Sequence, residues 1–399
     1  GAMRVRMLLA LTALPRSLAT TQPLFAWLAT CGTEESIPIE LRASCCGDGI
    51  GAFLTRPMQA GEVVFAIPAS PFISLSTALN HPTLGAAFQQ LWDSSSDGGV
   101  ALLAGLVAHL QLNGGEPHAY LSMLPSSLAT QNSVLWWTDD EVALLAGTSA
   151  HDEAISLRAE ADEAIDLLKN TALSADVALH GEAAVADAMR AALVGVLSRA
   201  YAVLGEGGRP CKTLVPLLDA INHHSAAPTI DYLFTGAPGD EGGGAGAGLL
   251  IARSLCDQPA GAELLVSYGE QPDLLFGLHY GFVPPPDYEA RTLAEEVEAV
   301  RDELLAEAAA AVRESPLGTS EGRGANADAL RAAAFMRLEA IKRGAERARD
   351  TAGGRSVRAC SASLALALRQ SEKRVLQHGA LMAARRLGRE GRFLFVDLY

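Results

Sequence analysis

The spacing of hydrophobic residues changes twice along the chain. Short apolar runs, several of them with every second residue apolar, occur at residues 37–68 and 213–268, and this period is typical of strands. Between these regions, from about residue 74 to residue 199, apolar residues recur every three or four positions, which predicts helices. From residue 291 the helical spacing returns with alternating charges. The pattern predicts a β-rich unit interrupted by a helical block and followed by a second helical block.

The same periods predict individual elements. Helices are expected at 23–30, 100–112, 139–146, 154–168, 182–201, 293–312, 328–349 and 357–387, and strands at 37–43, 213–218, 229–234, 249–253 and 263–268. In the segment AFLTRPMQAGEVVFAIP, the turn Gln59-Ala60-Gly61 predicts a hairpin that follows a glycine loop at residues 47–51. Strands are expected on both sides of the glycine-rich residues 236–248, which favours a hairpin tip over a nucleotide-binding loop.

The composition is that of a folded, acidic chain. Its 399 residues are 49% hydrophobic, and the net charge is −15. Sequence-independent binding to nucleic acid needs a basic surface, so the charge argues against it and suits a basic protein or peptide better. The six cysteines show no paired spacing, which predicts neither a zinc knuckle nor a disulfide framework and indicates a reducing compartment. No stretch reaches about 20 uninterrupted apolar residues, so we expect no membrane span.

Residues 1–21 differ in composition from the remainder of the chain. Gly1-Ala2-Met3 resembles a cloning remnant, and residues 4–21 are basic, rich in Leu, Ser and Thr, and free of acidic residues. This composition is similar to that of a targeting segment. An ordinary N-terminal helix or a fraying tail is the alternative interpretation.

Polar side chains interrupt two of the apolar runs near the ends of expected strands. They are Asp219, Asn222 and His223 in DAINHHS, and Tyr268 in VSYG. Buried polar groups must find hydrogen-bond partners, and strand ends commonly present binding groups, so the pattern indicates a site. The loop at 47–51 lacks the G-x-x-x-x-G-K-[ST] pattern, which favours a tight turn over a phosphate-binding loop.

Four segments in a fixed order carry a resemblance to one protein family. GDGIGAFLTRPMQAGEVVFAIP resembles the opening of a SET domain, DAINHH its Asn-His signature, and VSYG its catalytic tyrosine strand. HAYLSMLP and LWWTDDEVALLAGT, together with the two helical blocks, are similar to the Rubisco large-subunit methyltransferase subgroup. The resemblance implies an α+β fold: a β-rich SET domain interrupted by a helical insertion and followed by an all-helical C-terminal domain.

The resemblance also implies domain boundaries and partners. A tag remnant and targeting segment would occupy residues 1–21, the two parts of the SET domain 22–75 and 196–290, the helical insertion 76–195, and a helical substrate-binding domain 291–399. The implied partner is a protein substrate that carries a target lysine, bound by a monomer in the chloroplast or the cytoplasm. Neither nucleic acid nor a membrane is expected as a partner.

The activity that the resemblance implies is methyl transfer from S-adenosylmethionine to the ε-amine of a lysine in a non-histone protein. The residues that match cofactor-binding positions are Asp48, Ile50, Arg199 (in SRAY), Asp219, Asn222 and His223; Tyr268 matches the catalytic tyrosine, and Tyr232 and Tyr280 match aromatic positions around the target side chain. One departure is Asp273, which stands where the family usually has Asn.

Three other functions compete with this interpretation. A SET-fold binding module without turnover would keep the same motifs, since fold does not fix function. A histidine-directed protein methyltransferase is the second, and Tyr280 favours lysine over it. A metal hydrolase built on Asp219, His223, His224 and His279 is the third, and these residues lack a defined ligand spacing.

Overall fold

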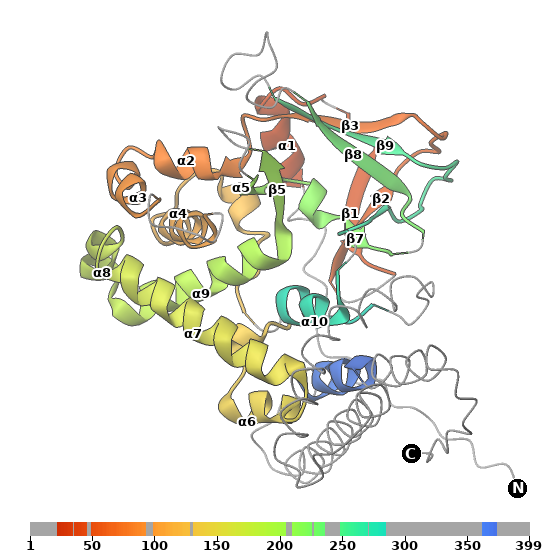
Figure 1. The fold of residues 1–399 in the computed structure, drawn as a ribbon. Helices are drawn as coiled ribbons and strands as arrows, with labels where there is room; N and C mark the ends of the chain where they lie inside the picture. Colours follow the sequence, from red (N-terminus) through yellow and green to blue (C-terminus); the bar gives the residue numbers. More distant parts are fainter. Residues whose placement is uncertain are drawn as a thin grey trace, which may run out of the picture. The chain divides into compact units, whose positions relative to one another are not determined.

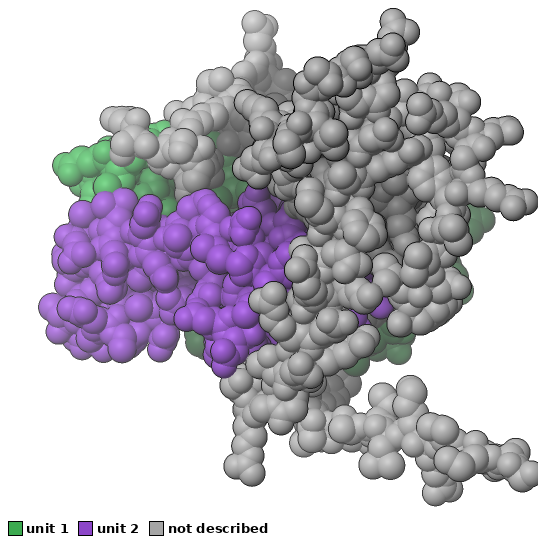
Figure 2. Space-filling model, turned by 60° about the horizontal axis from the view of Figure 1, so that its bottom comes forward, with its two compact units in different colours: residues 1–124, 199–267 green, residues 125–198, 268–399 purple. Residues whose placement is uncertain are grey.

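The computed structural model contains both helices and strands (Figure 1). It describes residues 22–34, 36–45, 49–92, 99–127, 131–204, 210–225, 227–235, 248–269, 271–284 and 361–372. Predictions for residues 1–21, and for the helical domain at 291–399 apart from 361–372, lie outside the described residues. The chain divides into unit 1, residues 1–124 and 199–267, and unit 2, residues 125–198 and 268–399 (Figure 2). The expected domain boundaries remain predictions.

The first hairpin of unit 1 encloses the glycine loop. Strand β1 (Ile39–Ala43) pairs antiparallel with β2 (Ile50–Leu54), with Ala43 opposite Ile50. The hairpin expected around Gln59-Ala60-Gly61 is therefore wrong, because β3 (Val63–Pro68) pairs with β9 (Leu249–Ser254) and not with β2. The turn itself exchanges backbone hydrogen bonds with the equivalent turn after β9, where Met58 and Gln258 are mutual partners at 2.9 Å.

Three further sheets complete the strands of unit 1. Strand β8 (Ile230–Thr235) pairs antiparallel with β9, so β3, β9 and β8 lie side by side (Figure 1). This confirms the strands expected on either side of residues 236–248, of which 236–247 lie outside the described residues. The other two sheets consist of β4 (Ile73–Ser74), β6 (Pro210–Leu214) and β5 (Ala200–Leu204), and of the parallel pair β7 (Asn222–His223) and β10 (Leu265–Val266).

Two expected strands are shorter in the structure than the apolar runs that predicted them. Strand β6 ends at Leu214 and not at residue 218, and β10 covers only two residues of the expected 263–268. The first difference has a local cause. Pro216 has no N–H to donate to a ladder, and Leu217 has a φ of 71°, so the chain turns there.

The helices of unit 1 surround the long apolar helix α4. They are α1 (Gln22–Thr30), α2 (Leu75–Leu79), α3 (Gly85–Trp92), α4 (Val100–Leu112) and α5 (His118–Leu121). Helix α4 has the predicted bounds, and it buries all residues from Leu102 to Ala108. Both α1 and α4 pack against α5, which carries Tyr120. A short helix therefore holds a tyrosine inside the core of this unit.

Unit 2 contains helices at the predicted positions 139–146, 154–168 and 182–201 and within the predicted 357–387, and further helices that the sequence did not predict. They are η2 (Val134–Trp136), α6 (Asp139–Val142), η3 (Ala143–Leu145), α7 (Ser149–Lys169), α8 (Ser174–His180), most of α9 (Glu182–Arg199), α10 (Asp273–Leu275), η6 (Phe276–Tyr280) and a helix at residues 361–372. The acidic start of α6 is a capping box, in which Thr138 and the buried Glu141 bond to each other's backbone amides.

The core of unit 2 joins the tryptophan segment to the helix at 361–372. Trp137 is 3% exposed, and it packs in one cluster with Leu145, Leu278, Leu364 and other apolar residues. Trp137 is therefore part of the core of unit 2. Among the described residues of the chain, none of the helices has the length and apolar character that crossing a membrane requires.

Candidate functional site

Arg199, Asp219 and Tyr120 form a buried polar cluster in unit 1. The Tyr120 hydroxyl donates to Oδ2 of Asp219 at 2.8 Å. Nη1 of Arg199 donates to the backbone carbonyl of Asp219 at 2.9 Å and lies 3.8 Å from its Oδ2. The side chain of Asp219 is 4% exposed and Tyr120 is 1% exposed, whereas 25% of the Arg199 side chain reaches solvent. The cluster therefore holds one edge of a guanidinium that is still partly open to a ligand.

A strained turn places Asp219 in this cluster. Leu217, fully buried, adopts φ 71° and ψ −43°, a conformation that costs non-glycine residues about 1–3 kcal/mol and persists only where the surroundings impose it. The turn is closed by a backbone bond from Asp219 to Val215, and the Tyr201 hydroxyl donates to the carbonyl of Leu218 at 3.1 Å. The short helix η5 (Leu218–Ala220) follows directly.

Burial and charge act in opposite directions on the Asp219 carboxyl. Burial raises its pKa above the ordinary value of 3.8, and Arg199 and the Tyr120 hydrogen bond oppose the rise. Burial, followed by the neighbouring Asp219 charge, raises the pKa of Tyr120 well above its ordinary value. The phenol consequently stays protonated and donates to the carboxylate.

A second polar cluster in unit 1 joins the start of β2 to β7 and to the segment before β10. Nδ2 of Asn222 donates to the Ile50 carbonyl at 3.2 Å and to Oε1 of Glu263 at 3.0 Å. Glu263, 7% exposed, also accepts from the Ser44 hydroxyl at 2.7 Å and from the backbone N–H of Cys45 at 2.8 Å. This carboxylate therefore fixes both ends of the glycine loop relative to Asn222.

The environment of Glu263 favours its charged form. Burial alone would raise its pKa, but hydrogen bonds from Cys45, Asn222 and Ser44 together lower the pKa below the ordinary 4.5. The cluster also explains the glycine at position 51. A Cβ there would lie 2.1 Å from Oε1 of Glu263 and 3.2 Å from Nδ2 of Asn222, so any larger residue would displace the carboxylate from its hydrogen bonds.

His223 lies beside this cluster on β7. The pKa of His223 is lowered to about 4, chiefly by burial and to a smaller extent by the neighbouring His224, against the opposing effect of a hydrogen bond to the Val266 backbone. Its Nε2 lies 2.8 Å from the Ser225 hydroxyl. The imidazole is therefore neutral near pH 7. His224 accepts from the backbone N–H of Ala227 at 3.1 Å, in agreement with its interpretation as a loop residue.

Unit 2 brings Tyr268 and Tyr280 together. Their ring centroids lie 5.0 Å apart at an interplanar angle of 32°. Gln271 connects the two residues, because its Nε2 donates to the Tyr268 carbonyl at 2.9 Å and lies 3.4 Å from the Tyr280 hydroxyl. Phe276 and Phe282 contact the Tyr280 ring from 5.5 Å and 6.3 Å.

The backbone around Tyr280 is fixed by close contacts. The Tyr280 carbonyl accepts from Nε2 of Gln131. Gly281 has a φ of 80°, and a Cβ on it would lie 2.2 Å from the Asn132 carbonyl oxygen. Asp273, at the start of α10, is buried and accepts from the hydroxyl of Ser371 in the helix at 361–372. This carboxylate thereby connects two helices of unit 2.

The predicted site residues fall into three groups. Ile50, Arg199, Asp219, Asn222 and His223 lie in the two clusters of unit 1 and on β7, and Tyr268 and Tyr280 form the pair in unit 2. Tyr232 lies on β8 in unit 1, where its ring meets Tyr201 at 5.3 Å and Phe234 at 5.7 Å. Asp48 lies outside the described residues. The roles assigned to these side chains remain predictions.

Sequence reasoning missed three residues that hold the predicted ones. Glu263, Tyr120 and Gln271 bond to Asn222, Asp219 and the tyrosine pair respectively. A charged Glu263 inside the run AELLVSY was a usable signal, because a carboxylate in a buried strand needs partners. For Tyr120 and Gln271 the sequence contains no comparable local signal.

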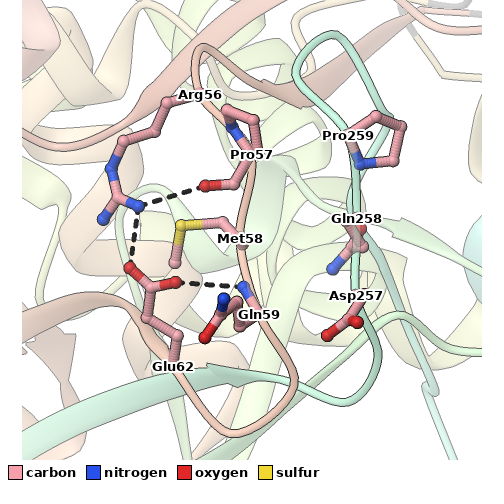
Figure 3. Close-up of a pocket in the computed structure, with 8 residues that line it drawn as sticks. All are labelled: Arg56, Pro57, Met58, Gln59, Glu62, Asp257, Gln258 and Pro259. Carbon is pink, nitrogen blue, oxygen red and sulfur yellow. Dashed lines mark hydrogen bonds and ion pairs between the residues drawn. The ribbon is translucent and has the colours of Figure 1, made fainter.

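One pocket lies apart from these clusters, between the turns that follow β2 and β9 (Figure 3). It has a volume of about 610 Å³ and is lined by Arg56, Pro57, Met58, Gln59, Glu62, Asp257, Gln258 and Pro259. None of the predicted site residues lines it. Arg56 pairs with Glu62 at 2.7 Å, and Glu62 also accepts from the Gln59 backbone. These bonds stabilise the turn. Because no predicted site residue lines the pocket, it does not change the candidate site.

The fold has known counterparts. It is the fold of SET-domain structures of Rubisco LSMT. The SET domain of LSMT bound to lysine and AdoHcy superposes with a TM-score of 0.65 at 16% identity, covering 94% of this chain and 92% of that chain. Rubisco LSMT bound to AdoMet gives 0.61 at 17% identity, covering 92% of each chain. The complex with sinefungin and monomethyllysine gives 0.59 at 15% identity, with the same coverage.

Comparisons at the level of sequence give no match. Neither a protein-family model nor a curated protein matches the chain. In the described part of the chain, no group of three or more His, Cys, Asp or Glu side chains is arranged to hold a metal ion. The structural likeness therefore establishes the fold, and the function is argued from the site.

Proposed function

We propose that the chain is an S-adenosylmethionine-dependent methyltransferase that acts on the ε-amine of a lysine in a non-histone protein. The solved structures with this fold support the proposal, since they are bound to AdoMet, or to lysine and AdoHcy. The observation that carries it is the parallel pairing of β7 with β10. In this pairing Leu265 lies opposite Asn222 and Val266 opposite His223, and Tyr268 follows the end of β10 by two residues in the sequence.

The side chains of unit 1 fit the polar ends of this cofactor. The quarter-exposed guanidinium of Arg199 offers donors to the carboxylate of the amino-acid part. Asn222 uses its Nδ2 for Ile50 and Glu263, which leaves Oδ1 as an acceptor for a donor on the ligand. Ile50 is 38% exposed beside it and offers an apolar contact. When bound, the cofactor supplies an electrophilic methyl group on a sulfonium.

The tyrosines of unit 2 suit the target amine. Two neighbouring tyrosine rings, with centroids 5.0 Å apart, can present a ring face to an alkylammonium group, with a contribution of about 0.5–2 kcal/mol. In the proposed reaction Tyr268 is catalytic, because its phenol can accept from or donate to the amine and orient its lone pair. Tyr280 and Tyr232 bind the aliphatic stem and head of the lysine. Orientation of this kind supplies several kcal/mol of the barrier in a displacement reaction.

Tyr268→Phe tests the proposal most sharply. The purified chain is incubated with methyl-labelled S-adenosylmethionine and a hypomethylated lysate, and the labelled amino acid is identified after hydrolysis. We expect methyl-lysine with the wild type and a rate at least about 100-fold lower with the variant, because one oriented hydroxyl is lost. Cofactor affinity, measured by calorimetry, should change less than about threefold, since Arg199 and Asn222 are untouched.

Each other outcome identifies a competing function. Bound cofactor with no labelled protein would favour a SET-fold binding module. Labelled methyl-histidine would favour a histidine-directed enzyme. Absence of both binding and labelling would contradict the proposal.

A further inference from the structure

We propose that Tyr120 is a positioning residue for cofactor binding: its hydroxyl fixes the Asp219 carboxylate, which in turn holds Arg199 in the orientation that receives the cofactor's carboxylate. This inference rests on the proposed function. It assigns a role to a residue of α5 that lies far in the sequence from Asp219 and Arg199. The hydroxyl donates to Oδ2 at 2.8 Å, and Arg199 lies 3.8 Å from the same oxygen.

The phenol is itself held in place. Tyr120 is 1% exposed, and the Trp27 ring of α1 stacks on it with centroids 6.4 Å apart and an interplanar angle of 7°. A tyrosine fixed by packing offers its hydroxyl in one direction, which a surface side chain would not do. Asp219 therefore receives its hydrogen bond from a rigid donor.

Arg199 depends on Asp219 for its position. It is the last residue of α9, and its Nη1 donates to the Asp219 carbonyl and forms an ion pair with the Asp219 carboxylate. Its Nε is buried and has no hydrogen-bond partner in the described structure. A long, flexible side chain held at one nitrogen is sensitive to any shift of the carboxylate beside it. The side chain of Asp219 therefore lies between Tyr120 and Arg199 and contacts both.

The ligand chemistry follows from the charge of the cluster. A guanidinium with one edge held and a quarter of its side chain exposed is suited to a planar carboxylate. Among the parts of the proposed cofactor, only the amino-acid end carries one. Loss of the Tyr120 hydroxyl should therefore weaken binding of ligands with this carboxylate and leave ligands without it unaffected.

Two ligands that differ in this one group provide the test. Calorimetry is carried out with S-adenosylmethionine and with decarboxylated S-adenosylmethionine, on the wild type and on Tyr120→Phe. We expect the variant to bind the first about fivefold to tenfold more weakly, because a buried acceptor loses its donor. Binding of the decarboxylated ligand should change less than about twofold, and Arg199→Ala should show the same selectivity with a larger loss.

Tyr201→Phe is the matched control. Tyr201 also donates to the turn that carries Asp219, but to the carbonyl of Leu218 and not to the carboxylate. Because this hydroxyl does not contact the carboxylate, any loss of affinity in this variant should be equal for the two ligands. If Tyr120→Phe does not fold, as judged by thermal unfolding, Asp219→Asn replaces it with the same expected selectivity.

The outcomes separate this inference from the proposed function. If the wild type binds S-adenosylmethionine but Tyr120→Phe weakens both ligands equally, or neither, the positioning role is wrong and the proposed function stands. If the wild type binds neither ligand, the proposed function and the inference are both wrong. Selective loss with the carboxylated ligand supports the inference.

Discussion

At the scale of single residues, polar clusters determine how the strand ends of unit 1 are arranged. Glu263 accepts hydrogen bonds from Ser44, Cys45 and Asn222, and the absent Cβ of Gly51 makes room for it. The glycine loop is therefore held by a carboxylate and not only by its own turn.

Gly51→Ala should destabilise the chain and weaken cofactor binding. A Cβ 2.1 Å from Oε1 of Glu263 forces the carboxylate to move, and such overpacking costs about 1–3 kcal/mol of unfolding free energy. Urea unfolding measures the loss, and calorimetry measures the cofactor affinity.

A double-mutant cycle with Glu263→Ala identifies the cause of that loss. Because the second change removes the clashing atom, the double variant should lose less than the sum of the two single variants. Strict additivity would show that Gly51 matters for another reason.

The protonation of His223 gives a pH-dependent prediction. Its pKa in the folded chain is about 4, below the ordinary 6.5, because burial disfavours the charged ring. A depressed pKa stabilises the fold above pH 6.5, and this stability is lost as the pH falls through 4. His223→Gln should therefore show a smaller decline in unfolding free energy over this interval than the wild type.

An NMR titration of the histidine ring protons measures the same group directly. The His223 signal should remain that of a neutral imidazole down to about pH 5 and titrate near 4. A midpoint near 6.5 would show that the ring is solvated and not buried beside Val266.

At the scale of elements, the helices were predictable and the strand partners were not. Apolar residues at helical spacing gave α4 its bounds without error, because the period is a local property. The hairpin expected for β2 and β3 was wrong, since the partner of β3 is β9, about 190 residues away, and no local signal reports such a pairing. The turn at Leu217 was also missed, because its positive φ is imposed by burial.

The candidate site was likewise predictable only where the signal is local in the sequence. Motif positions such as Asn222 and Tyr268 could be read from short segments of sequence. The residues that support them could not be predicted in this way. Tyr120, for example, lies 99 positions from Asp219 in the sequence and contacts it only in the folded chain.

Close packing of η6 against the helix at 361–372 gives a prediction for the region that holds Tyr280. A Cβ on Gly277 would lie 2.5 Å from Cδ2 of Leu368. Gly277→Ala should lower the unfolding free energy by about 1–3 kcal/mol, and the thermal midpoint should fall accordingly. Combined with Leu368→Ala, the loss should be smaller than the sum of the two single losses, because the clashing methyl groups are removed.

A Gly277→Ala variant as stable as the wild type would contradict this packing. Gly277 and Leu368 both lie in unit 2, so the result also tests whether the helix at 361–372 covers η6 in solution.

At the scale of the whole molecule, the structural likeness establishes the fold, and the activity is our proposal. The chain shares its fold with Rubisco LSMT structures over more than nine-tenths of its length. Its net charge of −15 is compatible with a basic protein segment as the proposed substrate. In the proposed reaction, side chains of unit 1 hold the cofactor's carboxylate and the tyrosine pair of unit 2 orients the amine. The central claim is that the chain methylates lysine.

Mass spectrometry of methylated sites tests this claim most directly. Wild-type protein or Tyr268→Phe is added with S-adenosylmethionine to hypomethylated lysate from the source organism, and newly methylated residues are mapped. We predict new methyl groups on lysine side chains with the wild type, and loss of nearly all of them with the variant. Equal methylation by both proteins, or no new lysine methylation with the wild type, would contradict the account.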